Sequence, residues 1–323
     1  MHIILLTLLR LLSFYLGTTL TFLLLSPLLP RASFYYRLLS SYGTLVLCAL
    51  YGVLASTILR LFGDYRISQW ATARAFKHTM ALTTGIKFDI VSGSQHLDTR
   101  PCVLIGNHQS ELDVLLLGTI FPKYCSVTAK SSLKRMPFLG WFMALSGTVF
   151  IDRADRKSAV KAFEGAVEEM KQKRQSVFIF PEGTRSYASG PEMGAFKKGA
   201  FHLAVQAGMP VVPVVCANYW GVLSVREQRF RAGRIPVKVL PPIPTSHLTA
   251  ADVDELTRTT RETMLQELIT LTETPFGQKA TKASVTAGEE NLAQLASRQG
   301  SDGVATGTDA WEEKIGRSMK GLR

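Results

Sequence analysis

Two long uncharged stretches occupy most of the N-terminal part of the chain. Residues 11–30 contain no charged side chain, and neither do residues 38–59. A helix crosses the hydrocarbon core of a bilayer in about 20 residues, so each stretch is long enough to do so. The segment between them, Arg31–Arg37, is too short for a domain. The pattern predicts a helical hairpin over residues 1–62 that anchors the chain in a membrane, either spanning it or inserting halfway.

A cleaved signal peptide is the alternative for the first stretch, because Arg10 gives it a short basic flank. The apolar run is long for such a peptide, no small-residue cleavage site follows it, and a second apolar run begins almost at once. The hairpin is therefore the simpler interpretation. Arginines lie at every boundary of the two stretches, so charge alone leaves the orientation across the membrane open.

In residues 63–86, Trp70, Ala73, Phe76 and Met80 occur at helical spacing among basic residues. This pattern predicts an amphipathic connecting helix that lies along the membrane surface. At the other end of the chain, residues 275–323 are rich in small and polar residues and cannot bury enough surface to offset the entropy of ordering. We expect a disordered tail there; a weak membrane-touching helix around Trp311 and the basic residues 314–323 is the alternative.

Short apolar runs alternate with helical patterns between residues 87 and 274. Strands are predicted at residues 102–105, 125–129, 148–151, 177–180, 211–215 and 237–240, and helices at 111–120, 156–174, 197–207 and 250–274. Strands that are apolar throughout are usually covered on both faces, and alternation with helices indicates parallel pairing. The predicted fold class is α/β, with a mostly parallel central sheet flanked by helices and preceded by the hydrophobic hairpin. Reactive residues in this class gather where strands end and helices begin.

The charge balance narrows the kinds of partner. The 323-residue chain has a formal net charge of +12 and 46% hydrophobic residues. Basic residues beside apolar anchors favour anionic lipid head groups or phosphorylated substrates. No helix-turn-helix, zinc-finger or RNP-like pattern supports nucleic acid as a partner. The four cysteines occur singly in apolar runs, away from any metal-ligand spacing, so we expect small buried side chains and no metal site.

The first candidate for chemistry is residues 107–113 (NHQSELD), which follow a predicted strand. A neutral imidazole accepts a proton from an attacking hydroxyl, and a carboxylate fixes its tautomer, so His108 is the candidate base and Asp113 its orienting partner. Five residues apart on one helix, the two side chains would diverge. They meet only if His108 precedes the helix, with Ser110 as its N-cap. Alternatively, Asn107 and Ser110 cap a helix and His108 is incidental.

The second candidate is residues 180–186 (FPEGTRS), which follow another predicted strand. Gly183 lets the backbone approach a ligand closely, and Arg185 offers a planar fork of donors that suits a phosphate. Glu182 is free to bind Arg185 or a substrate hydroxyl. A strand-end turn with a solvated ion pair is the alternative, but the nearby cations Lys197 and Lys198 favour an anion site.

These segments resemble the sequence motifs of the glycerolipid acyltransferases. Residues 107–113 resemble their N-H-x4-D first motif and residues 180–185 their FPEGTR third motif, while residues 147–153 (GTVFIDR) are similar to the second and residues 212–215 (VPVV) to the fourth. The basic segment 130–134 resembles the one that precedes the second motif. Four motifs in the family's order make the resemblance highly specific, and it covers roughly residues 89–240. Within the family, 1-acyl-sn-glycerol-3-phosphate acyltransferases with an N-terminal hairpin, including the fungal type, are the nearest likeness.

The resemblance implies a glycerol-3-phosphate acyltransferase-like fold and transfer of an acyl group from acyl-CoA to the sn-2 hydroxyl of lysophosphatidic acid, which yields phosphatidic acid. The catalytic roles pass to His108 and Asp113. Substrate-binding roles pass to Arg153, Glu182, Gly183, Thr184, Arg185 and, as a weaker candidate, Lys130. The chain has no G-x-S-x-G nucleophile motif, which agrees with direct attack by the acceptor hydroxyl.

Partners and location follow from the same chemistry. Acyl-CoA is a co-substrate, no cofactor is expected, and lysophosphatidic acid and membrane lipids are the other partners. Acyl-CoA is a large polyanion that does not cross a bilayer, so we expect the catalytic domain of an endoplasmic reticulum membrane protein to face the cytosol. The alternatives are an acyltransferase for glycerol-3-phosphate or another lysophospholipid, and a non-catalytic protein that binds anionic lipid. The sequence does not encode the oligomeric state.

Overall fold

A seven-stranded sheet forms the centre of the fold, in the strand order β1-β9-β6-β2-β5-β3-β4. The computed structural model describes residues 2–152 and 156–273, which belong to one unit of the chain. The strands of this sheet are β1 (Ile86–Ser92), β2 (Val103–Gly106), β3 (Cys125–Lys130), β4 (Val149–Ile151), β5 (Ser176–Ile179), β6 (Val211–Cys216) and β9 (Gly233–Val239). Strands β6, β2, β5, β3 and β4 are parallel neighbours, whereas β9 pairs antiparallel with β6 and parallel with β1. The α/β class with a mostly parallel sheet is confirmed.

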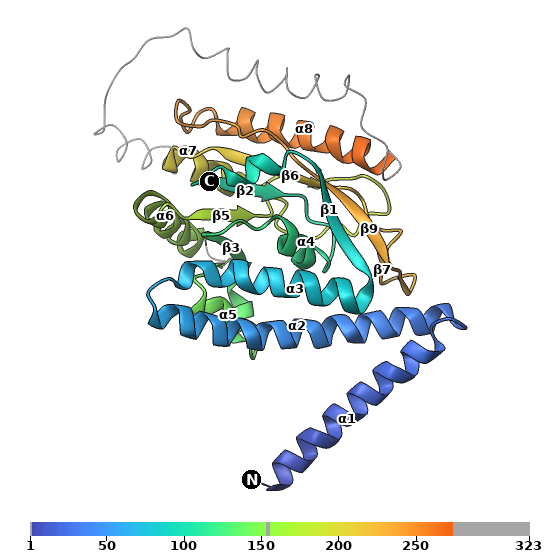
Figure 1. Ribbon diagram of the computed structural model, residues 1–323. Helices are drawn as coiled ribbons and strands as arrows, with labels where there is room; N and C mark the ends of the chain where they lie inside the picture. The colour runs from blue at the N-terminus through green and yellow to red at the C-terminus, as the bar shows by residue number, and fades with distance from the viewer. Residues whose placement is uncertain (1, 153–155, 274–323) are drawn as a thin grey trace. The chain divides into compact units, whose positions relative to one another are not determined.

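Helices cover both faces of this sheet (Figure 1). They are α1 (His2–Leu25), α2 (Pro30–Leu61), α3 (Ser68–Thr84), α4 (Asp113–Ile120), α5 (Leu139–Leu145), α6 (Arg156–Lys173), α7 (Gly199–Ala207) and α8 (Val253–Glu273), with the short 3-10 helices η1 (Tyr65–Ile67), η2 (Ser94–Asp98) and η3 (Ser131–Arg135). Helices α6, α7 and α8 pack on one face, α3 and α4 lie on the other, and α2 packs outside α3 and against α5. Strands β2, β5 and β6 are buried along their whole length because both faces are covered.

Every strand and helix predicted between residues 87 and 274 is present, with ends shifted by at most four residues. The predicted boundary at residue 87 falls inside β1. The sequence pattern missed β1, helix α5 and the small antiparallel hairpin of β7 (Leu223–Ser224) and β8 (Arg229–Phe230). Strand β1 carries Lys87 and Asp89 on its less buried positions, so it lacks the continuous apolar run that marked the other strands.

The N-terminal hairpin has a different layout from the predicted one. Residues 31–37, expected to connect the two helices, lie inside α2, which begins at Pro30. The connection is residues 26–29. Proline is favoured in the first turn of a helix because its missing N–H has no partner there, so Pro30 starts a helix where the pattern had placed the end of one.

The membrane-surface role predicted for residues 63–86 is wrong for their apolar face. Phe76 and Met80 of α3 are buried in the main hydrophobic core, together with Phe34 and Cys48 of α2. Helix α3 ends at Thr84 and is followed by Gly85, which adopts a φ of +73° as a left-handed cap. Helical spacing alone does not distinguish a face that meets lipid from one that meets protein, because both require the same apolar stripe.

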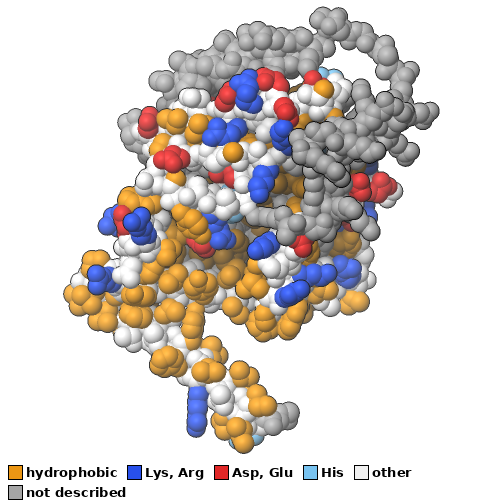
Figure 2. Space-filling view, turned by 180° about the vertical axis from the view of Figure 1, so that it is seen from behind, with side chains coloured by type: hydrophobic (Ala, Val, Ile, Leu, Met, Phe, Trp, Pro, Cys, Tyr) orange, Lys and Arg blue, Asp and Glu red, His pale blue; other side chains and the backbone are white. Residues whose placement is uncertain are grey.

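Helix α1 differs from α2 in its surroundings. None of its residues is buried, and its large apolar side chains, such as Ile3 and Phe14, are exposed. Figure 2 shows hydrophobic side chains along this helix. Both α1 and α2 are long and apolar enough to cross a membrane, but one face of α2 packs against the domain. This large exposed apolar surface associates the protein with a membrane.

The four cysteines, Cys48, Cys102, Cys125 and Cys216, are free and buried, as expected. Burial raises the pKa of the Cys102 thiol to about 12. These side chains therefore behave as small apolar groups of the core. The predicted disordered tail, residues 275–323, lies outside the described residues, as does the alternative helix around Trp311.

Candidate active site

His108 and Asp113 meet at the carboxyl end of β2. Nδ1 of His108 lies 2.7 Å from Oδ2 of Asp113, and the imidazole stacks on the Phe180 ring at a centroid distance of 4.1 Å. Helix α4 begins at Asp113, so His108 stands in the loop before it, as the pairing requires. The carboxylate accepts a hydrogen bond from Nδ1–H, which leaves Nε2 as the basic nitrogen. The geometry is that of a base and its orienting partner.

The Asp113 carboxylate is surrounded by donors. Oδ2 also accepts hydrogen bonds from the backbone N–H groups of Gln109 and Ser110, and Oδ1 accepts one from the hydroxyl of Tyr219 at 2.7 Å. Its side chain is only 1% exposed. Four donors match the acceptor capacity of an ionised carboxylate, and they hold it in one orientation. Burial, followed by the charge of Asp113, raises the pKa of Tyr219 far above its ordinary value, so Tyr219 remains a donor.

Ser110 is not the N-cap that the sequence predicted. The cap position of α4 is Leu112, and Ser110 Oγ instead accepts from the Leu112 N–H at 3.2 Å and lies 3.0 Å from the Tyr219 hydroxyl. The Asp113 side chain reaches back and accepts hydrogen bonds from the N–H groups of residues 109 and 110. It therefore stabilises the turn as a capping serine was expected to do.

Asn107 does not cap a helix either. Its side-chain amide forms two hydrogen bonds with the backbone of Cys216, both of 2.9 Å, at the end of β6. Gln109 donates to the carbonyls of Cys216 and Ala217 at 3.0 Å. These contacts extend the pairing of β2 with β6 beyond the last residue of β2. The loop is therefore fixed on both sides of His108 by contacts with the end of β6.

Glu182 joins the first motif to the third. Its Oε1 accepts from the His108 N–H and its Oε2 from the Gly194 N–H, each at 2.7 Å. The residue is buried, and burial raises its pKa, although the two backbone N–H groups oppose that shift. Of the two partners that the sequence left open for Glu182, Arg185 is not the one it contacts, because Arg185 forms an exposed ion pair with Glu111 instead. Both oxygens are engaged with backbone, which points to positioning of the His108 loop.

Gly183 brings a cation next to the backbone. It has a φ of +70°, a conformation that favours glycine. A Cβ atom on Gly183 would lie 3.0 Å from Nζ of Lys197, so the lysine packs over the turn. Lys197 is exposed and forms no ion pair with any residue that the structure describes, whereas its neighbour Lys198 pairs with Asp254 at 2.7 Å. The turn therefore presents a free ammonium group.

Arg185 forms an ion pair with Glu111. Its guanidinium lies 3.1 Å from Oε1 of Glu111 and 3.3 Å from the hydroxyl of Tyr187, which itself donates to Glu111 at 2.5 Å. Burial lowers the pKa of Arg185, but the bond to Tyr187 and the charge of Glu111 outweigh it and raise the pKa overall. Tyr187 has a φ of +49° and is fixed by its N–H bond to the Gln109 carbonyl. The guanidinium is charged and close to the surface.

The remaining predicted substrate-binding residues are less constrained. Thr184 is exposed beside Arg185. Lys130 is exposed at the end of β3, next to β5 in the sheet, and its register partner is Ile151 at the end of β4. The carboxyl ends of parallel strands lie at one edge of a sheet, so Lys130 shares the edge that holds His108 and Glu182. Arg153 lies outside the described residues.

Comparison with known proteins places these residues in a family context. An acyltransferase family model matches residues 90–217. A 1-acyl-sn-glycerol-3-phosphate acyltransferase of Saccharomyces cerevisiae is 44% identical over 238 residues, which cover 74% of this chain and 78% of the yeast protein. The human 1-acyl-sn-glycerol-3-phosphate acyltransferase beta is 34% identical and covers 83% of this chain and 96% of its own.

The chain belongs to the 1-acyl-sn-glycerol-3-phosphate acyltransferase family. The crystal structure of a 1-acyl-sn-glycerophosphate acyltransferase from Thermotoga maritima shares its fold, with a TM-score of 0.53 and 24% identity over 78% of this chain and 94% of that one. The expected resemblance is confirmed, and the protein is an acyltransferase. The alternative of a non-catalytic lipid-binding protein is wrong.

The sequence reasoning missed Tyr219 in this acyltransferase. The tyrosine is buried, lies beyond the end of β6 and completes the shell of donors around Asp113. A signal was available, because a polar aromatic residue placed directly after an apolar strand satisfies the same rule that selected His108. Glu111 was missed for another reason: its partners Arg185 and Tyr187 are 74 and 76 positions away. Pairing at that separation appears only in the folded chain.

Proposed function

We propose that the protein transfers an acyl group from acyl-CoA to the sn-2 hydroxyl of 1-acyl-sn-glycerol-3-phosphate, which produces phosphatidic acid. The names of the yeast and human relatives support this acceptor. The observation that carries the proposal is the 2.7 Å bond between His108 and Asp113 on the same sheet edge as Arg185. A base and a phosphate-binding group on one edge suit an alcohol with a phosphate on the adjacent carbon.

In the proposed reaction, Nε2 of His108 takes the proton of the acceptor hydroxyl while its oxygen attacks the thioester carbonyl carbon. Asp113 keeps the imidazole in the required tautomer and stabilises the imidazolium that forms. The tetrahedral intermediate collapses with cleavage of the carbon–sulfur bond. The imidazolium then returns its proton to the thiolate of CoA. The reaction balances with acyl-CoA as co-substrate and needs no cofactor.

The acceptor phosphate is assigned to the cations beside the Gly183 turn. Arg185 offers a fork of donors and Lys197 a free ammonium group close to the Gly183 backbone. Thr184 and Lys130 extend this polar edge, and Arg153 remains a predicted contributor. Glu182 acts through the loop: it holds the His108 backbone and so sets the distance between base and phosphate site.

The proposed location is the endoplasmic reticulum membrane, with the catalytic domain on the cytosolic side. The apolar surface of α1 supports attachment to a membrane. Acyl-CoA does not cross a bilayer, so the site faces the compartment that supplies it. An enzyme held at the head-group level captures a lipid acceptor without extracting its chain from the membrane.

His108→Ala tests the proposed base. The turnover number should fall by about 10²- to 10⁴-fold, because proton transfer in the transition state is lost. The measurement is transfer of a labelled acyl group from acyl-CoA by purified enzyme. His78→Ala, an exposed histidine on α3, is the matched control and should retain full turnover. Wild-type turnover by His108→Ala would show that another group is the base.

A panel of acceptors tests the substrate. Wild-type enzyme is assayed with lysophosphatidic acid, glycerol-3-phosphate and lysophospholipids with larger head groups at matched concentrations. We expect the highest kcat/KM for lysophosphatidic acid, since a compact phosphate monoester fits the Arg185 and Lys197 pair. A higher kcat/KM for any other acceptor would replace lysophosphatidic acid in the proposal.

A further inference from the structure

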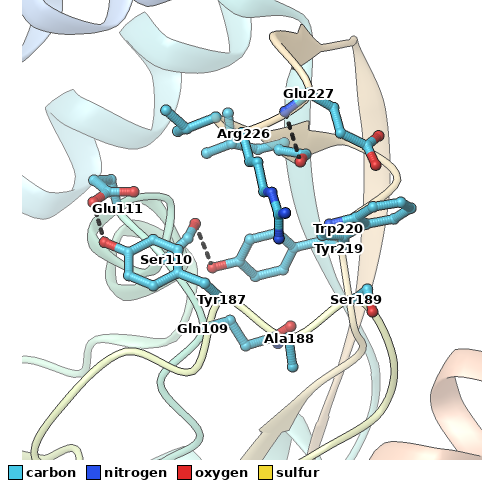
Figure 3. Close-up of a pocket in the computed structure, with 13 residues that line it drawn as sticks. Gln109, Ser110, Glu111, Tyr187, Ala188, Ser189, Tyr219, Trp220, Arg226 and Glu227 are labelled. Carbon is cyan, nitrogen blue, oxygen red and sulfur yellow. Dashed lines mark hydrogen bonds between the residues drawn. The ribbon is translucent and has the colours of Figure 1, made fainter.

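A cleft of about 900 Å³ opens beside the His108 loop. One wall is residues 109–111 and another is residues 187–189. The third wall comes from the segment after β6, residues 219–227, which includes strand β7 and the tip of the β7–β8 hairpin. Figure 3 shows Arg226 extending from this hairpin into the cleft, in front of Tyr219. Arg226 is not among the predicted site residues, and the proposed reaction gives it no role.

The charges around the cleft leave Arg226 as an excess cation. Glu111 is neutralised by Arg185 at 3.1 Å, and Glu227 by Arg229 at 2.6 Å. The Arg226 side chain is exposed at the cleft. Its guanidinium has no hydrogen-bond or ion-pair partner within the described part of the chain. The cleft therefore has one uncompensated positive charge, which favours an anionic ligand.

The wall that holds Arg226 is fixed in place. Leu223 and Phe230, at the base of the hairpin, are buried, and Gln228 donates to the hydroxyl of Tyr35 on α2 at 3.3 Å. The Trp220 ring beside the cleft is stacked by Arg229 at 4.0 Å. Arg226 is thus an exposed cation on a supported scaffold. Binding of a ligand to Arg226 therefore loses little conformational entropy in the hairpin.

We propose that Arg226 binds a phosphate group of the acyl donor and that this cleft holds the donor's CoA moiety. The inference rests on the proposed function. In the acceptor, the phosphate is on the carbon next to the reacting hydroxyl, so its cations must be close to His108, and Arg185 and Lys197 fill that role. In acyl-CoA, the long pantetheine arm separates the thioester from the phosphates. A cation across this cleft from the His108 loop suits the second geometry.

The test compares two donors in wild-type enzyme and Arg226→Ala. With acyl-CoA, the variant should show kcat/KM about tenfold lower, through the donor KM, because one charge-assisted hydrogen bond is lost. With the same acyl group on N-acetylcysteamine, a thioester without phosphates, wild-type and variant should be equal. The acceptor KM should not change. Arg226→Lys, which keeps the charge without the fork, should recover part of the loss.

Arg231→Ala is the matched control, because Arg231 is an exposed arginine of the same hairpin region that does not line the cleft. It should match wild-type with both donors. An equal loss with both donors in Arg226→Ala would overturn the assignment, since the arginine would then act through the hairpin structure. A change confined to the acceptor KM, or no change, would overturn it too.

Direct binding of unacylated CoA separates this inference from the proposed function. Calorimetry should give a dissociation constant about tenfold higher for Arg226→Ala than for wild-type, without any turnover. If the wild-type enzyme prefers another acceptor but CoA binding still depends on Arg226, the cleft assignment stands and the proposed acceptor fails. Wild-type protein that does not bind CoA, or binds it as Arg226→Ala does, would end the assignment.

Discussion

The loop after β2 and the turn after β5 lie side by side but are built differently. In the loop, the Asp113 carboxylate is buried and accepts from four donors, and the His108 backbone is bonded on both its N–H and its carbonyl. In the turn, the Arg185 side chain is 39% exposed and its partners are exposed as well. The base that we propose needs one fixed orientation, which the enclosing protein gives it. The proposed phosphate-binding cation must exchange a protein partner for a ligand, which its exposure allows.

Asp113→Asn, in the enclosed loop, is expected to have the largest effect on turnover and stability. An amide retains one acceptor but directs an N–H group towards donors, so the imidazole loses its tautomer and orientation. We expect the turnover number to fall by about 10²- to 10⁴-fold and the free energy of unfolding to fall by about 1–3 kcal/mol. Turnover at saturating substrate and denaturant unfolding measure the two. Asp254→Asn, an exposed ion-pair residue, should leave both nearly unchanged. A fully active Asp113→Asn would show that orientation of His108 does not depend on the carboxylate.

Tyr219→Phe removes one of the four hydrogen-bond donors to Asp113 and so tests how far the enclosed loop depends on a single contact. The aromatic ring stays packed against Phe88, while Oδ1 of Asp113 loses its 2.7 Å bond. We expect the turnover number to fall by about tenfold, because one hydrogen bond to a charged group is lost and the other three remain. The KM values should be unchanged. Tyr36→Phe, which removes a hydroxyl bond to the Thr83 carbonyl between α2 and α3, is the control. An equal loss in the two variants would point to a general effect on the fold.

Glu111→Gln should produce the smallest change, and in the opposite direction. Removal of the internal anion frees Arg185, so the acceptor KM should fall by about two- to threefold, the size expected for an exposed ion pair. The gain should shrink at high salt, which screens the pair. In an Arg185→Ala background, where the acceptor KM is already raised, Glu111→Gln should have no further effect. A similar gain in that background would mean that Glu111 acts on another group.

The sequence predicted which residues form the candidate site better than it predicted the contacts between them. Motif spacing and the strand-end rule selected His108, Asp113 and the Gly183 turn, because short segments fix which residues follow a strand. The sequence left the partner of Glu182 open and did not reveal Glu111 as a partner of Arg185. Both contacts join segments that lie 74 positions apart. Pattern analysis within one segment contains no information on such pairs.

The sequence by itself determined the α/β class, most of the strands and helices between residues 87 and 274 and the apolar N-terminal helices, since each depends on local periodicity and burial of apolar side chains. Only the tertiary structure decided that α3 faces the core, that β9 runs antiparallel to β6 and that Tyr219 completes the Asp113 shell. It also decided which cations are free. The physical reason is that a charge or an apolar face has the same sequence pattern whatever meets it, and its partner is chosen when distant segments pack.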